Sequence, residues 1–199
     1  MSLKQTTKAD QHIDGDPWGE SAVLAAIQGA LNDVPGVLGS ARLMSHFGEH
    51  ALGWLSLAAL GYAVDAQRRP QWAMMGAAAF SSHAASVVVK RIIRRPRPHH
   101  PMVRTGVETP SKLSFPSSHA TSTTAALVAL LRLGLVPPQL RWAPKLGIPA
   151  IMLSRLVLGV HYPTDVTVGA MLGAGSAVAV EKLGQQVLAG RAQTERNAE

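Results

Sequence analysis

A histidine and an aspartate four residues apart are the residues best placed to do chemistry in this sequence. His161 ends the apolar stretch 154–160, and Pro163 follows where a new helix can begin, because proline loses nothing at the first helical position. Asp165 then falls in the first turn, from which its carboxylate can reach the imidazole. A carboxylate that holds one ring nitrogen leaves the other free as a nucleophile or base. On the preceding helix, Arg155 can bind an oxyanion through two N–H groups.

Two upstream stretches carry the same kind of chemistry. The first is a basic block that begins at Lys90 and ends at Arg97. Its other arginines are interpreted as anchors for lipid head groups. In the second stretch, Ser117 and Ser118 occupy the first turn of a predicted helix, where unpaired N–H groups and the helix dipole favour a phosphate. His119 follows directly and is close enough to protonate a leaving oxygen.

The three stretches form the patterns K-x6-R-P, P-S-x-H and S-R-x5-H-x3-D, in that order. Together they resemble the type-2 phosphatidic acid phosphatase family, which comprises membrane lipid phosphatases related to bacterial acid phosphatases and vanadium haloperoxidases. The resemblance covers residues 45–183 and departs from the family pattern at Ser118, where glycine is usual. A serine there keeps the backbone N–H but limits how closely the backbone can approach a phosphate.

The resemblance implies a reaction through a phosphohistidine that needs no metal ion or other cofactor. His161 would attack phosphorus, and Asp165 would orient it and stabilise its positive charge. His119 would protonate the leaving alkoxide and then activate water. The residues implied in binding the phosphate oxygens are Lys90, Arg97, Ser117, Ser118 and Arg155.

The implied substrate is a lipid phosphate in the bilayer. The family acts on phosphatidic acid, phosphatidylglycerol phosphate and polyprenyl diphosphates, and some short bacterial members act on a polyprenyl-phosphoryl ribose phosphate made at the cytoplasmic face. The short chain of 199 residues favours the last of these. The net charge of +7 would indicate nucleic acid as the partner of a soluble protein, but here the charge flanks apolar stretches and indicates membrane topology instead. The oligomeric state stays open.

Three other functions fit parts of the sequence. His46, Glu49 and His50 match the H-x-x-E-H pattern of some zinc hydrolases, but no third ligand is evident, so these residues are better interpreted as substrate lining near the mouth of the site. A vanadium haloperoxidase would use the same residues as the phosphatase. The apolar spans argue against this haloperoxidase function. The complete set of catalytic residues argues against the third function, a lipid-binding protein without activity.

The elements that must position these residues are predicted to be helices. We expect an all-α, polytopic membrane bundle with about five transmembrane helices, each of about 20 residues. The apolar stretches lie near residues 46–64, 72–89, 116–133, 146–160 and 163–180. Counting crossings from the second stretch onward brings all three motifs to one membrane face. Gly169 and Gly173 form a small-xxx-small pattern that predicts close packing inside the bundle.

The flanking regions complete the predicted organisation. Residues 1–16 are predicted to be a disordered tail, residues 17–34 an amphipathic interfacial helix, residues 45–183 the phosphatase domain and residues 184–199 an exposed tail. A helix packed against the bundle is an equally good interpretation of the second region. Basic residues divide evenly between the two membrane faces once the candidate phosphate ligands are set aside. Because export of the N-terminal region without a signal is unfavourable, a cytoplasmic active site is weakly favoured.

Overall fold

The computed structural model describes residues 16 and 18–197. Within this part of the chain the regular secondary structure is helical, with one isolated bridge between Pro96 and Leu113. The predicted all-α fold is confirmed. The α-helices are α1 (Glu20–Leu31), α2 (Val37–Phe47), α3 (Leu52–Val64), α4 (Arg69–Ile93), α5 (Ser118–Arg132), α6 (Trp142–Val157) and α7 (Pro163–Arg196).

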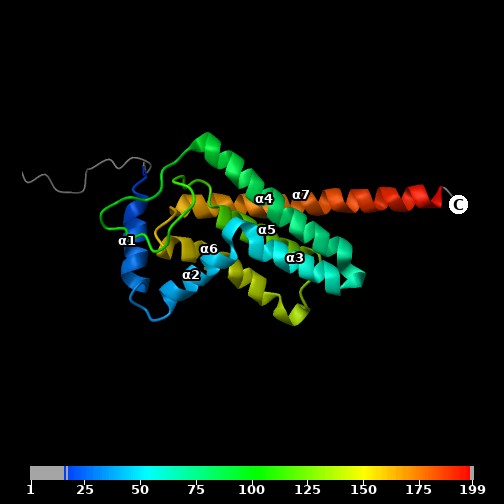
Figure 1. Cartoon of the computed structure of the whole chain (residues 1–199), viewed down its shortest axis with the longest axis horizontal. Coiled ribbons are helices and arrows are strands. Elements are labelled where there is room, and N and C mark those ends of the chain that lie inside the picture. Colours follow the sequence, from blue (N-terminus) through cyan, green and yellow to red (C-terminus); the bar gives the residue numbers. More distant parts are fainter. Residues whose placement is uncertain (1–15, 17, 198–199) are drawn as a thin grey trace, which may run out of the picture.

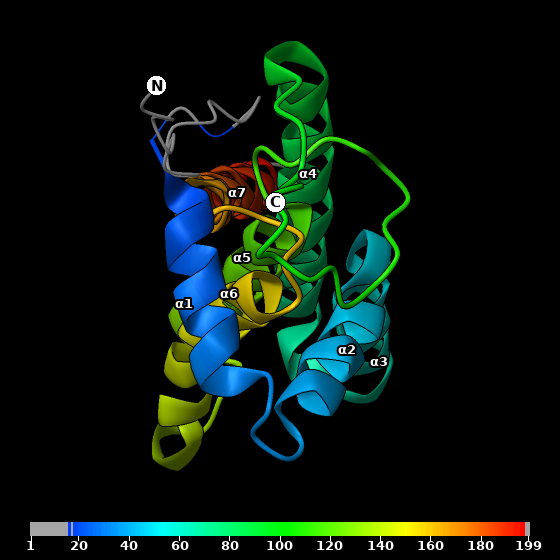
Figure 2. The same ribbon diagram turned by 90° about the vertical axis from the view of Figure 1, so that its left-hand side faces the viewer.

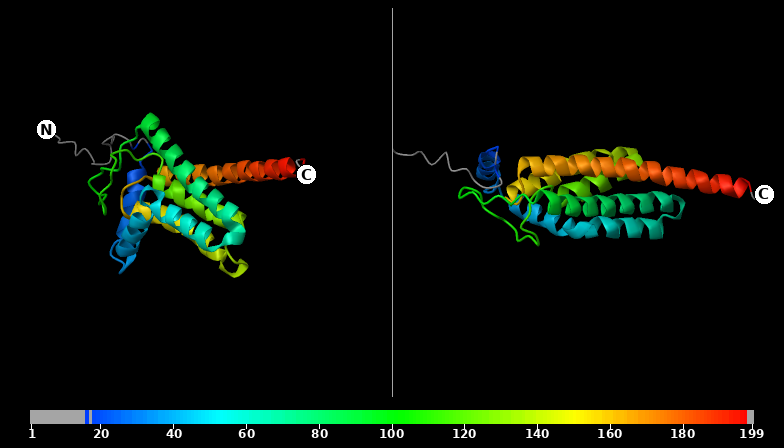
Figure 3. Two further views of the ribbon diagram at one scale, coloured as in Figure 1. Left: turned by 45° about the vertical axis from the view of Figure 1, so that its right-hand side comes forward. Right: turned by 90° about the horizontal axis from the view of Figure 1, so that it is seen from above.

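The longer helices run along a common direction, and α1 stands across one end of them (Figure 1). Helix α5 packs between α4 and α7, α3 covers α4, and α6 packs against α5 and α2. Helix α7 extends beyond its neighbours at its C-terminal end, as Figure 3 shows in both views. The segment that joins α4 to α5 loops over the opposite end, beside α1 (Figure 2). That end therefore gathers the termini of several helices and two connecting segments.

The core of the bundle is built from small side chains. Alanines from α3, α4, α5 and α7 are buried there together with Met75, while Phe80, Leu146 and Met171 are exposed. Small residues inside and large apolar ones outside are typical of helices that meet lipid, where close backbone approach replaces the hydrophobic effect. Among the described residues, the stretches Ala66–Ile93 and Pro163–Arg196 are long and apolar enough to cross a membrane.

The predicted close packing at the small-xxx-small pattern is confirmed. A Cβ added to Gly169 would lie 2.8 Å from the carbonyl oxygen of Ser117, and one added to Gly173 would overlap the carbonyl oxygen of Thr121. Helix α7 thus lies directly against the backbone of α5. This contact fixes the N-terminus of α5 beside the first turn of α7, where Asp165 lies.

We expect Gly173→Ala to destabilise the bundle although alanine is the better helix former. The added methyl group forces α5 and α7 apart, and overpacking of this kind costs about 1–3 kcal/mol. Gly175→Ala is the matched control, because nothing lies within 4 Å of a Cβ added at that position. Thermal unfolding in detergent measures both. An unchanged midpoint for Gly173→Ala would contradict the packing described here.

The expected membrane span at residues 46–64 is wrong in one respect, because it is not a single helix. Helix α2 ends at Phe47, a 3-10 turn occupies Glu49–Ala51, and α3 begins at Leu52. His50 has a φ of 50° and lies in the left-handed region. The chain is tightly folded at this turn, because a Cβ added to Gly53 would overlap the carbonyl oxygen of Phe47. The H-x-x-E-H residues therefore lie at a break and not on one helical face.

The outer boundaries also differ from those expected. Helix α7 continues to Arg196, well past residue 180, so residues 184–196 of the predicted exposed tail are helical. Helix α1 confirms a helix in the 17–34 region; it buries Leu24 and Gln28 and packs against α6. Its placement at the membrane interface stays a prediction. Residues 1–15 of the predicted disordered tail lie outside the described part of the chain.

Candidate active site

A cavity of about 580 Å³ opens at the end of the bundle where α1 and the α4–α5 segment lie. Its walls come from α2, the turn after it, α4, α5, α6 and two connecting segments. Most of the predicted site residues line it: Lys90, Arg97, Ser118, His119, Arg155 and His161, with His46, Glu49 and His50. Residues from separate helices thus converge as the sequence predicts.

The turn between α6 and α7 delivers His161 to this cavity. Gly159 has a φ of 65°, a conformation that favours glycine. A Cβ there would also overlap the carbonyl oxygen of Arg104. The next helix starts at Pro163, and the Asp165 carboxylate caps it by accepting a hydrogen bond of 2.8 Å from the Tyr162 N–H. Local chain geometry therefore places the carboxylate one turn after His161.

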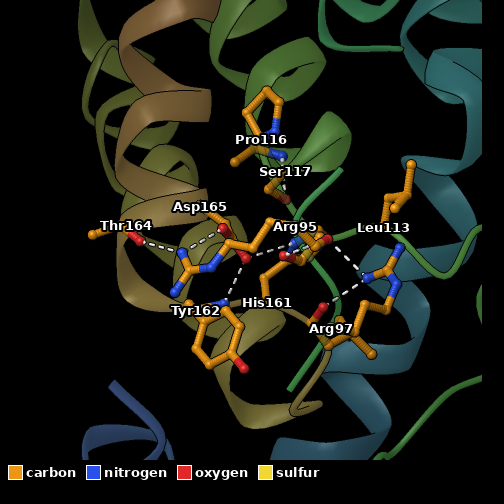
Figure 4. A network of polar contacts seen from close by, with 12 residues as sticks. Arg95, Arg97, Leu113, Pro116, Ser117, His161, Tyr162, Thr164 and Asp165 are labelled. Atoms are coloured by element: carbon orange, nitrogen blue, oxygen red, sulfur yellow. Dashed lines mark hydrogen bonds and ion pairs between the residues drawn. The ribbon is translucent and has the colours of Figure 1, made fainter. Parts of the chain in front are cut away.

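His161 lies between a carboxylate and an arginine. Its Nδ1 is 3.5 Å from Oδ2 of Asp165, and its Nε2 is 3.3 Å from Nη1 of Arg97 (Figure 4). The carboxylate side favours the tautomer with hydrogen on Nδ1, so that Nε2 keeps its lone pair and accepts from Arg97 in the structure without substrate. An imidazole held in this way can act as a nucleophile.

The site also keeps this imidazole neutral. Burial, together with the positive charges of Arg97, Lys90 and Arg155, holds the pKa of His161 well below its usual range. Burial likewise lowers the pKa of Arg97 to about 10, so its guanidinium remains charged at neutral pH. A neutral nucleophile beside fixed cations suits attack on an anionic substrate, because the cations attract the substrate and disfavour protonation of the nucleophile.

His119 faces the same cavity from the first turn of α5. Its Nε2 lies 3.0 Å from the carbonyl oxygen of Ser45 in α2. A carbonyl can only accept, so Nε2 carries the hydrogen and Nδ1 is the nitrogen left to exchange a proton. Gly48 closes the other side of the ring, because a Cβ there would lie 2.8 Å from Cδ2 of His119.

Different parts of the chain hold the three basic residues of the cavity, Lys90, Arg97 and Arg155. Lys90 donates to the carbonyl oxygens of Leu113, Ser114 and Pro116 at 2.9–3.2 Å, which ties α4 to the segment before α5. The Arg97 guanidinium donates to the carbonyls of Ser111 and Val160 at 2.8 and 2.6 Å. Lys90 therefore shapes the site through the backbone as well as lining the cavity.

Arg155 is anchored on α2. It donates to Oγ of Ser45 at 3.0 Å and to the carbonyl oxygen of Ala41 at 3.1 Å, and it is 1% exposed. Ser45 thus contacts both Arg155 and His119. Because α2 was not among the expected helices, neither the serine nor its role could be found from the motifs.

The two serines at the start of α5 differ in position. Ser117 is fully buried, its hydroxyl accepts a hydrogen bond of 3.4 Å from the Ala120 N–H, and it is not among the residues that line the cavity. Its own N–H donates to the carbonyl oxygen of Asp165 at 3.0 Å. Ser118 lines the cavity, and its hydroxyl accepts from that of Ser86 at 2.8 Å. In this structure Ser117 is the helix cap, and Ser118 supplies the hydroxyl that lines the cavity.

The sequence profile of the PAP2 superfamily matches residues 71–187. The chain belongs to this superfamily. The match includes every residue of the three motifs, from Lys90 to Asp165, so the resemblance drawn from them is confirmed. Helix α2, which supplies Ser45 and part of the cavity wall, lies before the matched region, as does α1.

Named relatives of this PAP2 protein are phosphatases. A decaprenylphosphoryl-5-phosphoribose phosphatase of Mycolicibacterium smegmatis is 57% identical over 153 residues, which are 77% of this chain and 82% of the relative. One of Mycobacterium tuberculosis is 51% identical over 168 residues, 84% and 92% of the two chains. The expectation of an enzyme of the phosphatase class is thereby confirmed.

Two solved structures share the fold. LpxE of Aquifex aeolicus superimposes with a TM-score of 0.66 at 19% identity, covering 81% of this chain and 94% of that one. A transmembrane PAP2-type phosphatidylglycerolphosphate phosphatase of Bacillus subtilis gives 0.64 at 23% identity, covering 85% and 88%. The expected membrane helical bundle is confirmed by this likeness.

The H-x-x-E-H residues line the cavity of the PAP2 site without forming a metal cluster. Among the described residues, no group of three or more His, Cys, Asp and Glu side chains could hold a metal ion. His50 instead faces His83 of α4, with ring centroids 6.1 Å apart. Together with His46 and Glu49 they form a polar wall of the cavity, which can contact a bound head group.

Gly48→Ala should impair the phosphatase activity of this PAP2 protein mainly through His119, the nearest side chain to the added methyl group. The backbone at Gly48 suits alanine, but the new methyl group presses on the imidazole, and misplacement of a catalytic group by about 1 Å costs up to about 10²-fold. Gly39→Ala is the control, because a Cβ there meets nothing within 4 Å. Steady-state kinetics compares the two, and equal kcat values would contradict the packing of Gly48 on His119.

Proposed function

We propose that this protein is an integral-membrane lipid phosphate phosphatase that hydrolyses polyprenyl-phosphoryl ribose phosphate through a phosphohistidine at His161. The observation that carries the proposal is the position of His161, whose Nδ1 lies 3.5 Å from Oδ2 of Asp165 and which lines a cavity together with Lys90, Arg97 and Arg155. A cavity with three fixed cations suits a phosphate group, whose negative oxygens they neutralise as charge develops.

In the first step, Nε2 of His161 attacks phosphorus. The bond between phosphorus and the sugar oxygen breaks, and its electron pair leaves with the alkoxide, which takes the proton on Nδ1 of His119. His119 therefore enters this step as the imidazolium, with hydrogen on both ring nitrogens, and leaves it neutral with hydrogen on Nε2. Asp165 stabilises the positive charge that develops on the phosphorylated imidazole. The cationic side chains stay in place throughout, so no reorganisation is required as the charge moves.

In the second step, water attacks the phosphohistidine. The neutral His119 accepts a proton from that water, the bond between phosphorus and Nε2 breaks, and inorganic phosphate leaves while both histidines return to their starting states. Ser118 and the N–H groups at the start of α5 are proposed to hold the phosphate oxygens, and Ser117 supports them as the cap of that helix.

The choice of substrate rests on the named relatives. Both are decaprenylphosphoryl-5-phosphoribose phosphatases, at 57% and 51% identity over most of either chain. The polar wall around His46, Glu49, His50 and His83 suits a head group rich in hydroxyls, which needs hydrogen-bond partners on the side away from the phosphate. Phosphatidic acid, phosphatidylglycerol phosphate and polyprenyl diphosphates are the alternative substrates.

The experiment is phosphate release by the purified protein, with EDTA present, from four lipids. They are phosphatidic acid, phosphatidylglycerol phosphate, a polyprenyl diphosphate and a polyprenyl-phosphoryl ribose phosphate. We expect release that survives EDTA and is fastest from the ribose phosphate. Faster release from another lipid would overturn the substrate, and release that EDTA abolishes would overturn the mechanism and direct attention to His46, Glu49 and His50.

We further propose that the protein crosses the membrane several times and that its active site lies at the cytoplasmic face. The family's polyprenyl-phosphoryl ribose phosphate is made at that face. The chain contains no cysteine, so single cysteines report topology cleanly. Thr105 is exposed beside the site, and Gln139 is exposed between α5 and α6. We expect a membrane-impermeant maleimide added to intact cells to label Gln139→Cys and not Thr105→Cys. The reverse labelling would contradict a cytoplasmic site.

A further inference from the structure

Behind Asp165, on the side away from the cavity, lies a buried ionic network. Arg95 donates from Nη1 to Oδ1 of Asp165 at 3.0 Å and to Oγ1 of Thr164 at 2.7 Å (Figure 4). Its guanidinium lies over the ring of Tyr162, 3.9 Å from the centroid. These three contacts, Tyr162, Thr164 and Asp165, all lie at the start of α7, directly after the nucleophile.

The same guanidinium joins this turn to the N-terminal helix. Nη2 of Arg95 donates to Oε2 of Glu20 at 2.7 Å. Glu20 in turn accepts from the N–H and the hydroxyl of Thr164, both at 2.8 Å. The side chains of Arg95 and Glu20 are each 9% exposed and that of Asp165 is 0% exposed. One cation is thus shared by two carboxylates in a water-poor setting, where each contact is strong.

Helix α1 is fixed by further contacts at both ends. At its start, the Asp16 carboxylate accepts from the N–H groups of Glu20 and Ser21 at 2.6 and 2.8 Å. Near its end, Gln28 donates to the carbonyl of Val157, at the end of α6, at 3.0 Å. These contacts fix the position of Glu20 relative to both α6 and α7. Its side chain can therefore hold Arg95 and the start of α7 in place.

We propose that Glu20 and Arg95 are positioning residues for the nucleophile, and that α1 is therefore part of the catalytic apparatus. Neither side chain lines the cavity, so they act through Asp165. Arg95 holds Oδ1, which leaves Oδ2 directed at His161 and at the Tyr162 N–H. Glu20 holds Arg95 and caps the N-terminus of α7. Without them the carboxylate can turn away from the imidazole, and both the tautomer and the stabilisation of the phosphohistidine are lost.

The test compares Arg95→Gln and Glu20→Gln with Arg94→Gln, a neighbouring arginine that is exposed. We expect kcat per folded molecule to fall on the order of 10²-fold in Arg95→Gln, with KM little changed, because a carboxylate displaced by about 1 Å costs that much. Glu20→Gln should lose less, since its amide still accepts from Thr164. The double variant should lose no more than Arg95→Gln alone, because both act in one network. Arg94→Gln should match the wild type.

A second readout needs no substrate. The kinetic test of the positioning role rests on the proposed function, because it requires a substrate. The tautomer of His161 can be followed without substrate, by ¹⁵N spectra of histidine-labelled protein in detergent. We expect hydrogen on Nδ1 in the wild type and in Arg94→Gln, and a mixed or reversed tautomer in Arg95→Gln. If the wild type cleaves no lipid phosphate while the tautomer still depends on Arg95, the proposed function fails and the positioning role stands.

Two results would overturn the positioning role. One is an Arg95→Gln protein with wild-type kcat and an unchanged His161 spectrum. The other is a purely structural loss, in which the yield of monodisperse protein falls while kcat per folded molecule and the spectrum stay constant. Arg95→Lys separates charge from geometry, because an ammonium keeps the charge without the planar fork. We expect it to restore only part of the lost kcat.

Discussion

His161→Ala should abolish phosphate release from every lipid phosphate that the wild type cleaves. The loss of a nucleophile that forms a covalent intermediate costs on the order of 10⁶-fold in kcat, which places the variant at the background of the assay. The variant should still fold and bind the lipid, because the arginines and the lysine around the cavity are held by backbone carbonyls and Ser45, not by the imidazole alone.

The control for this variant is His99→Ala. His99 is exposed in the α4–α5 segment, and its Nδ1 lies 3.1 Å from the carbonyl oxygen of Arg97 in the same segment. The His99→Ala variant therefore loses an imidazole near the site but none from the cavity. Phosphate release by the two variants is measured on equal amounts of monodisperse protein. Substantial release by His161→Ala would contradict the assignment of the nucleophile.

Asp165→Asn should lower kcat by about 10⁴-fold, the loss seen when the carboxylate behind a catalytic histidine becomes an amide. The amide keeps nearly the same shape, and donation from Arg95 holds its oxygen at the Oδ1 position, which places its NH₂ group where Oδ2 accepts from the Tyr162 N–H. It cannot stabilise the positive charge of the phosphohistidine, and its NH₂ group can present a donor to Nδ1. The tautomer then reverses, and Nε2 loses its nucleophilic lone pair.

KM should change little in Asp165→Asn, because the carboxylate does not line the cavity. Asp33→Asn is the control, since Asp33 is exposed between α1 and α2. A kcat within tenfold of the wild type would show that Asp165 is dispensable and would remove the basis for a positioning role of Arg95. A raised KM with normal kcat would instead indicate a binding role for the carboxylate.

The sequence predicts the part of the site that depends on short spacings. His161 and Asp165 are separated by one turn of chain, and Pro163 sets the start of the helix between them, so their meeting follows from local geometry. The convergence of Lys90, His119 and Arg155 follows from counting helices. Both arguments need only the positions of apolar stretches and helix breakers.

The remaining parts of the site depend on contacts that no local pattern announces. The break at Gly48–Ala51 contains no proline, and its positive φ angles fall on His50 and Ala51, which seldom adopt them. The resulting helix α2 brings Ser45 to Arg155 and His119 across more than 70 residues of sequence. Arg95 likewise appears in the sequence as one arginine in a basic block, and only the fold shows that it faces inward to Asp165.

The most direct test of the phosphohistidine at His161 is to trap it. The purified protein is mixed with lipid phosphate labelled with ³²P at the scissile phosphate, quenched within milliseconds in alkali, digested and analysed by mass spectrometry. We predict label that is stable to base and labile to acid, on the peptide that contains His161, present in wild type and absent from His161→Ala. Label on another residue, or full turnover with no labelled protein at any time, would contradict the mechanism.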